Sequence, residues 1–156
     1  MSYFFFQSQD PLGIFQSQLS FSATTLRAEY YQISLLGGMR DYRLAQTLDF
    51  GFMLVYGILI FAICVKWARL IEAKVEDSGS WAKMGYIAAV MGILAAGCDV
   101  VENIFILKMI STQPSSFDFP NNWALIHSSF ALIKWILLII SIGWYVTIRI
   151  KFRNKI

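Results

Sequence analysis

Three long apolar segments limit what this chain can fold into. They are Leu44–Val65, Met84–Leu107 and Trp123–Ile148. Each is at least as long as the ~20 residues that a helix needs to cross the hydrocarbon core of a bilayer. The sequence therefore predicts an all-α integral membrane protein, with a three-helix transmembrane bundle over residues 44–156.

The composition agrees with a membrane protein. Hydrophobic residues make up 57% of the chain and charged residues only 15%, against about a quarter in soluble domains. The net charge of +3 comes from clusters near the ends of the apolar segments, and no basic stripe with interleaved aromatic residues suggests nucleic acid as a partner. The N-terminus lacks the pattern of a signal peptide, so we expect no processing.

The first 43 residues are expected to lie outside the membrane and to contain a short amphipathic helix at about residues 23–36. Three hydroxyl residues can cap its first turn: Ser22, Thr24 and Thr25. Three apolar residues share one face at helical spacing: Leu26, Tyr30 and Ile33. Gly37-Gly38 ends the helix. This helix either lies in the plane of the membrane interface or packs on the ends of the spans. Because the chain must turn into the next helix within a few residues, we expect the second.

Lysine and arginine residues predict the orientation. Four lie in the connection between the first two spans: Lys66, Arg69, Lys74 and Lys83. Four more lie in the C-terminal tail: Arg149, Lys151, Arg153 and Lys155. By the positive-inside rule, both regions are cytoplasmic and the N-terminus lies outside. Three arginines before the first span count against this orientation: Arg27, Arg40 and Arg43.

Polar residues within the apolar segments are the candidates for a functional site. There are seven: Asp49, Tyr56, Asp99, Glu102, Asn103, His127 and Lys134. At ~1.5 Å per residue, the ionisable ones on the three helices fall roughly 6–17 Å below the outer surface of the membrane. Asp99 and Asn103 continue a stripe of small residues on the second span, and such stripes let membrane helices approach closely. These positions predict a polar chamber in the outer half of the bilayer, open to the outside.

The charges of this chamber predict one coupled group. A lone ion at the bilayer centre costs about 2.5–3.5 kcal/mol on insertion scales. Lys134 is therefore expected to pair with Asp99 and Glu102 on the neighbouring helix, with Asp49 and His127 nearby. No metal site is expected, and no cofactor can be assigned.

Three interpretations of these residues stay open. Polar side chains often only tie membrane helices together, each hydrogen bond contributing about 0.6 kcal/mol. Intramembrane ionisable residues are also candidates for a ligand site, here for a lipid-like molecule. A metal-assisted or acid–base enzyme is the third, although one histidine without a His-x-x-x-His spacing is a weak signal. We expect no catalytic residues.

A thin bundle of three helices leaves much apolar surface uncovered. We therefore expect a non-catalytic integral membrane subunit or accessory protein of an oligomer or larger complex. Its partners would be membrane lipids and either other membrane protein chains or further copies of itself. The alternative is a small membrane protein that binds a lipid-like ligand, or a membrane enzyme, in the polar chamber.

Several short motifs are spread along the chain. They are "FS" before the amphipathic helix, "GGMRDY" after it, an aspartate entering the first span and "DVVEN" in the second span. This set resembles small bacterial membrane proteins of no assigned activity, which implies the bacterial cytoplasmic membrane. The two cysteines, Cys64 and Cys98, are expected at different depths, too far apart for a disulfide within one chain.

Overall fold

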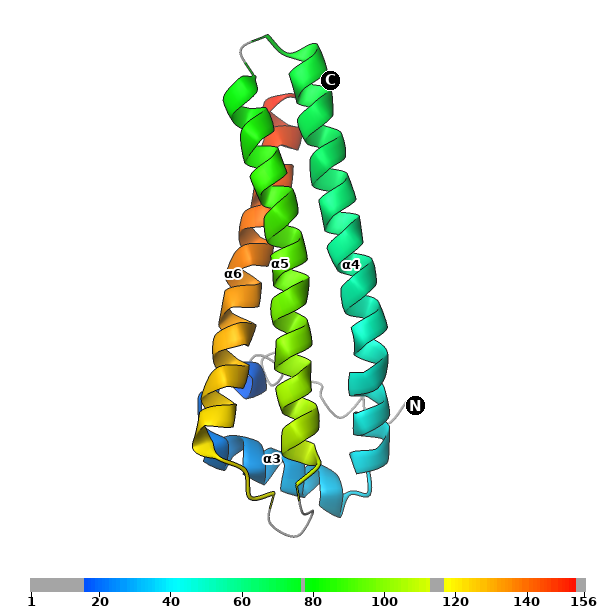
Figure 1. Cartoon of the computed structure of the whole chain (residues 1–156), viewed down its shortest axis with the longest axis vertical. Coiled ribbons are helices and arrows are strands. Elements are labelled where there is room, and N and C mark those ends of the chain that lie inside the picture. Colours follow the sequence, from blue (N-terminus) through cyan, green and yellow to red (C-terminus); the bar gives the residue numbers. More distant parts are fainter. Residues whose placement is uncertain (1–15, 77, 113–116, 154–156) are drawn as a thin grey trace. The chain divides into compact units, whose positions relative to one another are not determined.

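The computed structural model describes residues 16–76, 78–112 and 117–153, and every regular element in them is a helix. Figure 1 shows the four main helices, which are α3 (Ala23–Leu35), α4 (Met39–Lys74), α5 (Gly79–Ile110) and α6 (Asn121–Lys151). The last three are long and apolar enough to cross a membrane. The predicted fold class is therefore confirmed: the chain is an all-α integral membrane protein with three transmembrane helices and a short N-terminal helix. The N-terminal residues on which the signal-peptide prediction rests lie outside the described residues.

Each long helix extends beyond the apolar segment that predicted it. α4 has 36 residues, which at ~1.5 Å per residue is about 54 Å of helix. The hydrocarbon core is only about 30 Å thick, so the polar ends of α4 continue outside it. The division of the chain at residue 43 into extramembrane and membrane parts stays a prediction, and α4 runs through that point without a break.

The chain folds into two compact units that draw on the same three long helices. Unit 1 takes its residues from 1–51 and 99–132, and unit 2 takes its residues from 52–98 and 133–156. Unit 1 therefore contains α3 together with the start of α4, the end of α5 and the start of α6.

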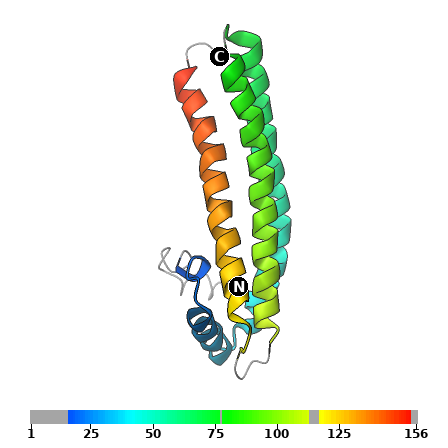
Figure 2. The same ribbon diagram turned by 60° about the vertical axis from the view of Figure 1, so that its left-hand side comes forward.

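The core of unit 1 forms where α3 packs on the ends of two long helices (Figure 2). Ser22 caps α3 by accepting a hydrogen bond from the backbone N–H of Thr25. Leu26 and Tyr30 are fully buried on its inner face. They pack against apolar residues of α5, α6 and the connection between them: Ile106, Met109, Ile110, Phe117, Phe119 and Ala124. α3 ends at Leu35, and Gly37, just after the C-cap residue Leu36, has a positive φ of 72°, which suits glycine. The expectation that this helix packs on the ends of the spans is confirmed.

Unit 2 is held together by close helix contacts. A Cβ atom on Gly92 of α5 would lie only 2.5 Å from Cγ2 of Ile60 on α4, so the two backbones approach where a side chain is missing. Ser141 of α6 donates a hydrogen bond to the carbonyl oxygen of Ala88, at 2.9 Å. Small residues and a short hydroxyl make these contacts, beside a core of larger side chains that includes Trp144, Ile148 and Phe152. Neither of the two cysteines, buried Cys64 and half-buried Cys98, forms a disulfide within the described residues.

Candidate functional site

The seven candidate residues divide between the two units. Unit 1 contains Asp49 on α4, three residues on α5 and His127 on α6; the three on α5 are Asp99, Glu102 and Asn103. Unit 2 contains Tyr56 and Lys134. Lys134 is buried, and its Nζ lies 5.5 Å from the ring centroid of Trp135. The pairing of Lys134 with the acids of α5, and the single chamber for all seven, stay predictions.

Asn103 ties α5 to α4 in unit 1. Its Nδ2 donates a hydrogen bond to Oδ2 of Asp49, at 2.9 Å, and a longer one to the carbonyl oxygen of Gln46, at 3.4 Å. Asn103 is only 2% exposed, while Asp49 is half-buried. A carboxylate acceptor makes this a stronger bond than one between neutral groups. The amide and the carboxylate therefore act together as a tie between two helices.

Two further ionisable residues in unit 1 are almost completely buried. Glu102 and His127 are each 1% exposed. Next to His127, Ser128 is fully buried, and its Oγ accepts a hydrogen bond from the backbone N–H of Phe21 at 3.2 Å. The start of α6 thus holds the residues that precede α3. Burying a charge-bearing group costs free energy unless the group is paired and hydrogen-bonded. The burial of Glu102 and His127 therefore restricts which polar contacts this part of unit 1 can accommodate.

Tyr30 brings α3 to the same region. Its ring is 1% exposed and lies 6.1 Å from the ring centroid of Tyr42 on α4. Burial foremost, with Glu102 among the smaller contributions, raises the pKa of Tyr30 well above its ordinary value. The helix that was expected only to pack on the spans therefore also carries a buried polar group, the phenol of Tyr30.

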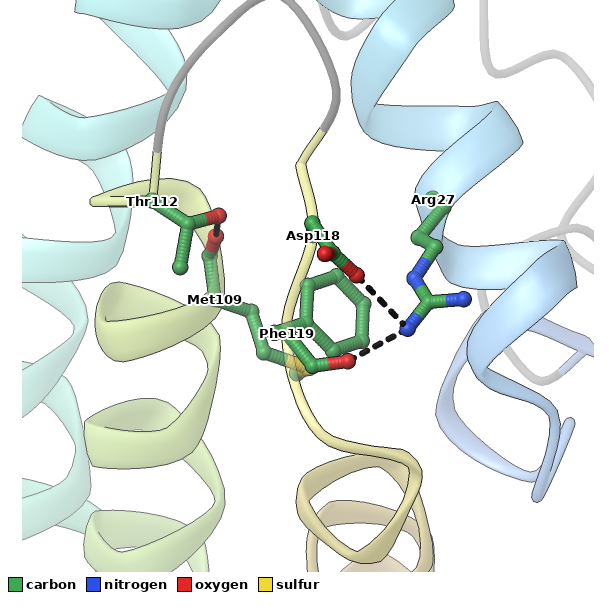
Figure 3. Close-up of polar contacts among 5 residues, drawn as sticks. All are labelled: Arg27, Met109, Thr112, Asp118 and Phe119. Carbon is green, nitrogen blue, oxygen red and sulfur yellow. Dashed lines mark hydrogen bonds and ion pairs between the residues drawn. The ribbon is translucent and has the colours of Figure 1, made fainter.

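An arginine on α3 holds the connection between α5 and α6 (Figure 3). Nη2 of Arg27 donates a hydrogen bond to the carbonyl oxygen of Phe119 at 2.5 Å, and the guanidinium lies 5.2 Å from the centroid of that residue's ring. It also lies 3.4 Å from Oδ1 of Asp118. Asp118 is highly exposed, so this ion pair contributes little. The hydrogen bond to the carbonyl oxygen of Phe119 and the contact with its ring therefore contribute most of the stabilisation.

The two best-formed hollows in the described part of the chain are lined by residues other than the seven candidates. The first, of about 450 Å³, lies between the end of α5 and the start of α6 and is lined mainly by Ile104, Leu107, Lys108 and Trp123. Among the described residues, no three His, Cys, Asp or Glu side chains lie close enough together to hold a metal ion.

Sequence reasoning missed Tyr30, Arg27 and the Phe117–Phe119 connection as parts of this region. Tyr30 had been placed on the buried face of α3, but that gave no sign that Glu102 lay nearby. Arg27 had been considered among the arginines before the first span. Its hydrogen bond could not be predicted from the sequence pattern, because the acceptor residue, Phe119, lies 92 residues away along the chain. What unit 1 can do chemically is hold several buried polar groups in fixed contact across four helices.

The tie between Asn103 and Asp49 predicts a measurable loss of stability. We expect Asn103→Leu to lower the free energy of unfolding by about 1 kcal/mol, because Asp49 loses its amide donor. Asn122→Leu is the matched control, since Asn122 is exposed and a surface change of this kind stays within about 0.5 kcal/mol. Equilibrium unfolding in mixed micelles measures both. Equal effects of the two variants would show that the bond does not tie the helices.

The chain was compared with known proteins at three levels. Descriptions of protein families, curated proteins and solved structures all yield no match.

Proposed function

We propose that this chain is a non-catalytic integral membrane subunit or accessory protein of an oligomer or larger membrane complex. The observation that carries the proposal is a set of exposed glycines inside the long helices: Gly51 on α4, Gly97 on α5 and Gly143 on α6. A Cβ atom added to any of them would meet nothing within 4 Å. None of these glycines is needed for packing within the described part of the chain.

Such glycines need a reason, because glycine inside a helix is less favourable than alanine by about 1 kcal/mol. Elsewhere in unit 2 the reason is visible: a Cβ on Gly57 would lie 2.8 Å from Cβ of Ala96. Gly143 instead lies on a face with the exposed residues Ile139 and Val146. Small residues flanked by large apolar ones are the surfaces on which membrane helices pack. Contact with another membrane helix explains why glycine is present at these exposed positions.

The described contacts of the buried polar residues agree with a structural role. Asn103 joins α5 to α4, Ser141 joins α6 to α5, and Ser128 holds the backbone before α3. Each of these hydrogen bonds links two different segments of the fold. In bilayers, where apolar side chains gain little by leaving lipid, such bonds and close packing are what hold helices together.

The proposal predicts that the exposed glycines matter for assembly and not for folding. Gly97→Leu with Gly143→Leu should reduce the assembled fraction at least about tenfold, because the added side chains block close approach. Native mass spectrometry of gently extracted protein measures the assembled mass. The melting temperature of the chain should stay within about 3 °C of wild type.

Gly57→Leu is the matched control, because the same substitution is made at a glycine packed within the chain. It should lower the melting temperature through overpacking, which costs typically 1–3 kcal/mol. A wild-type protein that is extracted alone, as one copy without a second protein, would contradict the proposed role. A bound lipid-like molecule in that preparation would favour the alternative, a ligand-binding protein or enzyme.

The near-complete burial of Glu102 and His127 is the observation that favours this alternative. Replacing Lys134 by Met distinguishes the two roles. If Lys134 pairs with Asp99 and Glu102 as the sequence predicts, Lys134→Met should destabilise the protein by about 3–5 kcal/mol, as breaking buried pairs does in soluble cores. Adding Asp99→Asn and Glu102→Gln should restore folding.

The structural role and the ligand-binding role are distinguished by which property the triple variant regains together with its folding. A structural tie predicts that the triple variant regains both thermal stability and assembly, whereas a ligand chamber predicts that stability returns without the bound ligand. A Lys134→Met protein with wild-type stability would mean that the acids of α5 have no such pairing.

The proposed orientation places the N-terminus outside and the C-terminus in the cytoplasm of a bacterial membrane. Two of the arginines that count against it have structural partners. Arg27 donates to the carbonyl oxygen of Phe119, and Arg43 donates to that of Ile110 at the end of α5. Cations near helix C-termini satisfy carbonyls that lack a helical partner. These two arginines are therefore accounted for without an orienting role, which supports the proposed topology.

Cysteine labelling tests this topology. Ser78 is buried and donates to the carbonyl oxygen of Ile71, so exposed Ser80 is the better site in the first connection, and exposed Asn122 serves at the start of α6. In a background with Cys64 and Cys98 replaced by alanine, Asn122→Cys should react with an impermeant reagent added outside, and Ser80→Cys only after permeabilisation. The reverse pattern would invert the topology.

A further inference from the structure

An open groove runs along one face of α4 in unit 2. Its volume is about 530 Å³, and its lining includes Phe61, Ala62, Val65 and Leu70 together with two cations, Lys66 and Arg69. This volume lies within the range of about 300–1,000 Å³ that is typical of ligand sites. The groove is therefore large enough for part of a ligand, and its chemistry is apolar with a positive centre.

The two cations have no partner of their own in the described residues. Neither Lys66 nor Arg69 forms an ion pair or a hydrogen bond with another described side chain. The nearest acidic residue along α4, Glu72, accepts a hydrogen bond from the hydroxyl of Tyr86, at 3.1 Å. The positive charge of the groove is thus left for something outside the described chain.

Other cations of unit 2 are positioned differently. The guanidinium of Arg149 lies 4.6 Å from the ring centroid of Trp67, and Nζ of Lys151 lies 4.1 Å from that of Trp81. Such contacts are worth about 0.5–2 kcal/mol and hold a cation at an aromatic face. Lys66 and Arg69 have no such contact with an aromatic ring among the described residues. A general need for positive charge at this end of the helices does not explain why these two line a groove.

We propose that this groove is a binding site for an anionic phospholipid of the surrounding bilayer. Lys66 and Arg69, three residues apart on one helix face, contact the phosphate and the rest of the charged headgroup. Phe61, Ala62 and Val65 lie up to ~12 Å farther along the helix from Arg69, toward the apolar part of α4, and contact the first part of an acyl chain. Charge complementarity selects the lipid, since two cations favour a headgroup with net negative charge over a zwitterionic one.

This inference does not depend on the proposed assembly. The groove lies on the unit 2 part of α4, and none of the exposed glycines Gly51, Gly97 and Gly143 lines it. It also does not depend on the orientation, because anionic lipid can be supplied to either leaflet. A chain that proved to be a monomer, or inverted, would keep the site.

Lipid titration by native mass spectrometry tests the site on the full chain. Phosphatidylglycerol should bind more tightly than phosphatidylcholine to the wild-type protein. Lys66→Gln with Arg69→Gln should weaken phosphatidylglycerol binding about 30-fold, or about 2 kcal/mol for the two cations together. Lys83→Gln with Arg153→Gln is the matched control, because both residues are exposed cations of unit 2 outside the groove. It should weaken binding less than about threefold.

A second variant separates the groove from its charges. Ala62→Phe places a ring in the groove and keeps both cations, so it should weaken phosphatidylglycerol binding about tenfold. Ala45→Phe, at an exposed alanine of α4 outside the groove, should leave binding unchanged. Equal binding of the two lipids by the wild-type protein would overturn the proposal. So would equal losses in the groove variants and their controls.

Discussion

The close approach of helix backbones in unit 2 is the constraint on which the rest of the membrane part depends. Lipid tails are as apolar as leucine, so burying apolar side chains between helices gains little in a bilayer. The helices are therefore held together by van der Waals contact at short range, and small residues are needed for the backbones to approach this closely. Gly92 beside Ile60 and Gly57 beside Ala96 allow this contact between α4 and α5. Ser141 adds a hydrogen bond to Ala88 from α6.

Unit 1 uses a different combination of forces. Here α3 buries Leu26 and Tyr30 against the ends of α5 and α6, in a core that resembles that of a small soluble protein. Backbone carbonyls at the helix ends need donors. Arg43 supplies one to Ile110, and Arg27 fastens Phe119 in the connection that follows. The buried polar residues of unit 1 thus share this unit with the N-terminal helix α3.

Both units leave apolar side chains exposed, and the two cations of the α4 groove, Lys66 and Arg69, have no partner among the described residues. The described contacts give these features no structural role. Exposed glycines point to a neighbouring helix, and the cations of the α4 groove point to an anionic headgroup. The two proposals concern different residues and different chemistry, so each can be tested alone.

The sequence by itself determined the class of fold, because length and apolarity of three segments leave a bilayer-crossing helix as the outcome that satisfies every backbone polar group. It also determined α3, since Ser22 can cap a helix, Leu26 and Tyr30 share a face, and Gly37 can end it. Only the tertiary structure decided which side chains meet. Asn103 reaches Asp49 across 54 residues, and Arg27 reaches Phe119 across 92. Helical periodicity indicates the face on which a residue lies, but the partner on that face is set by how distant segments pack.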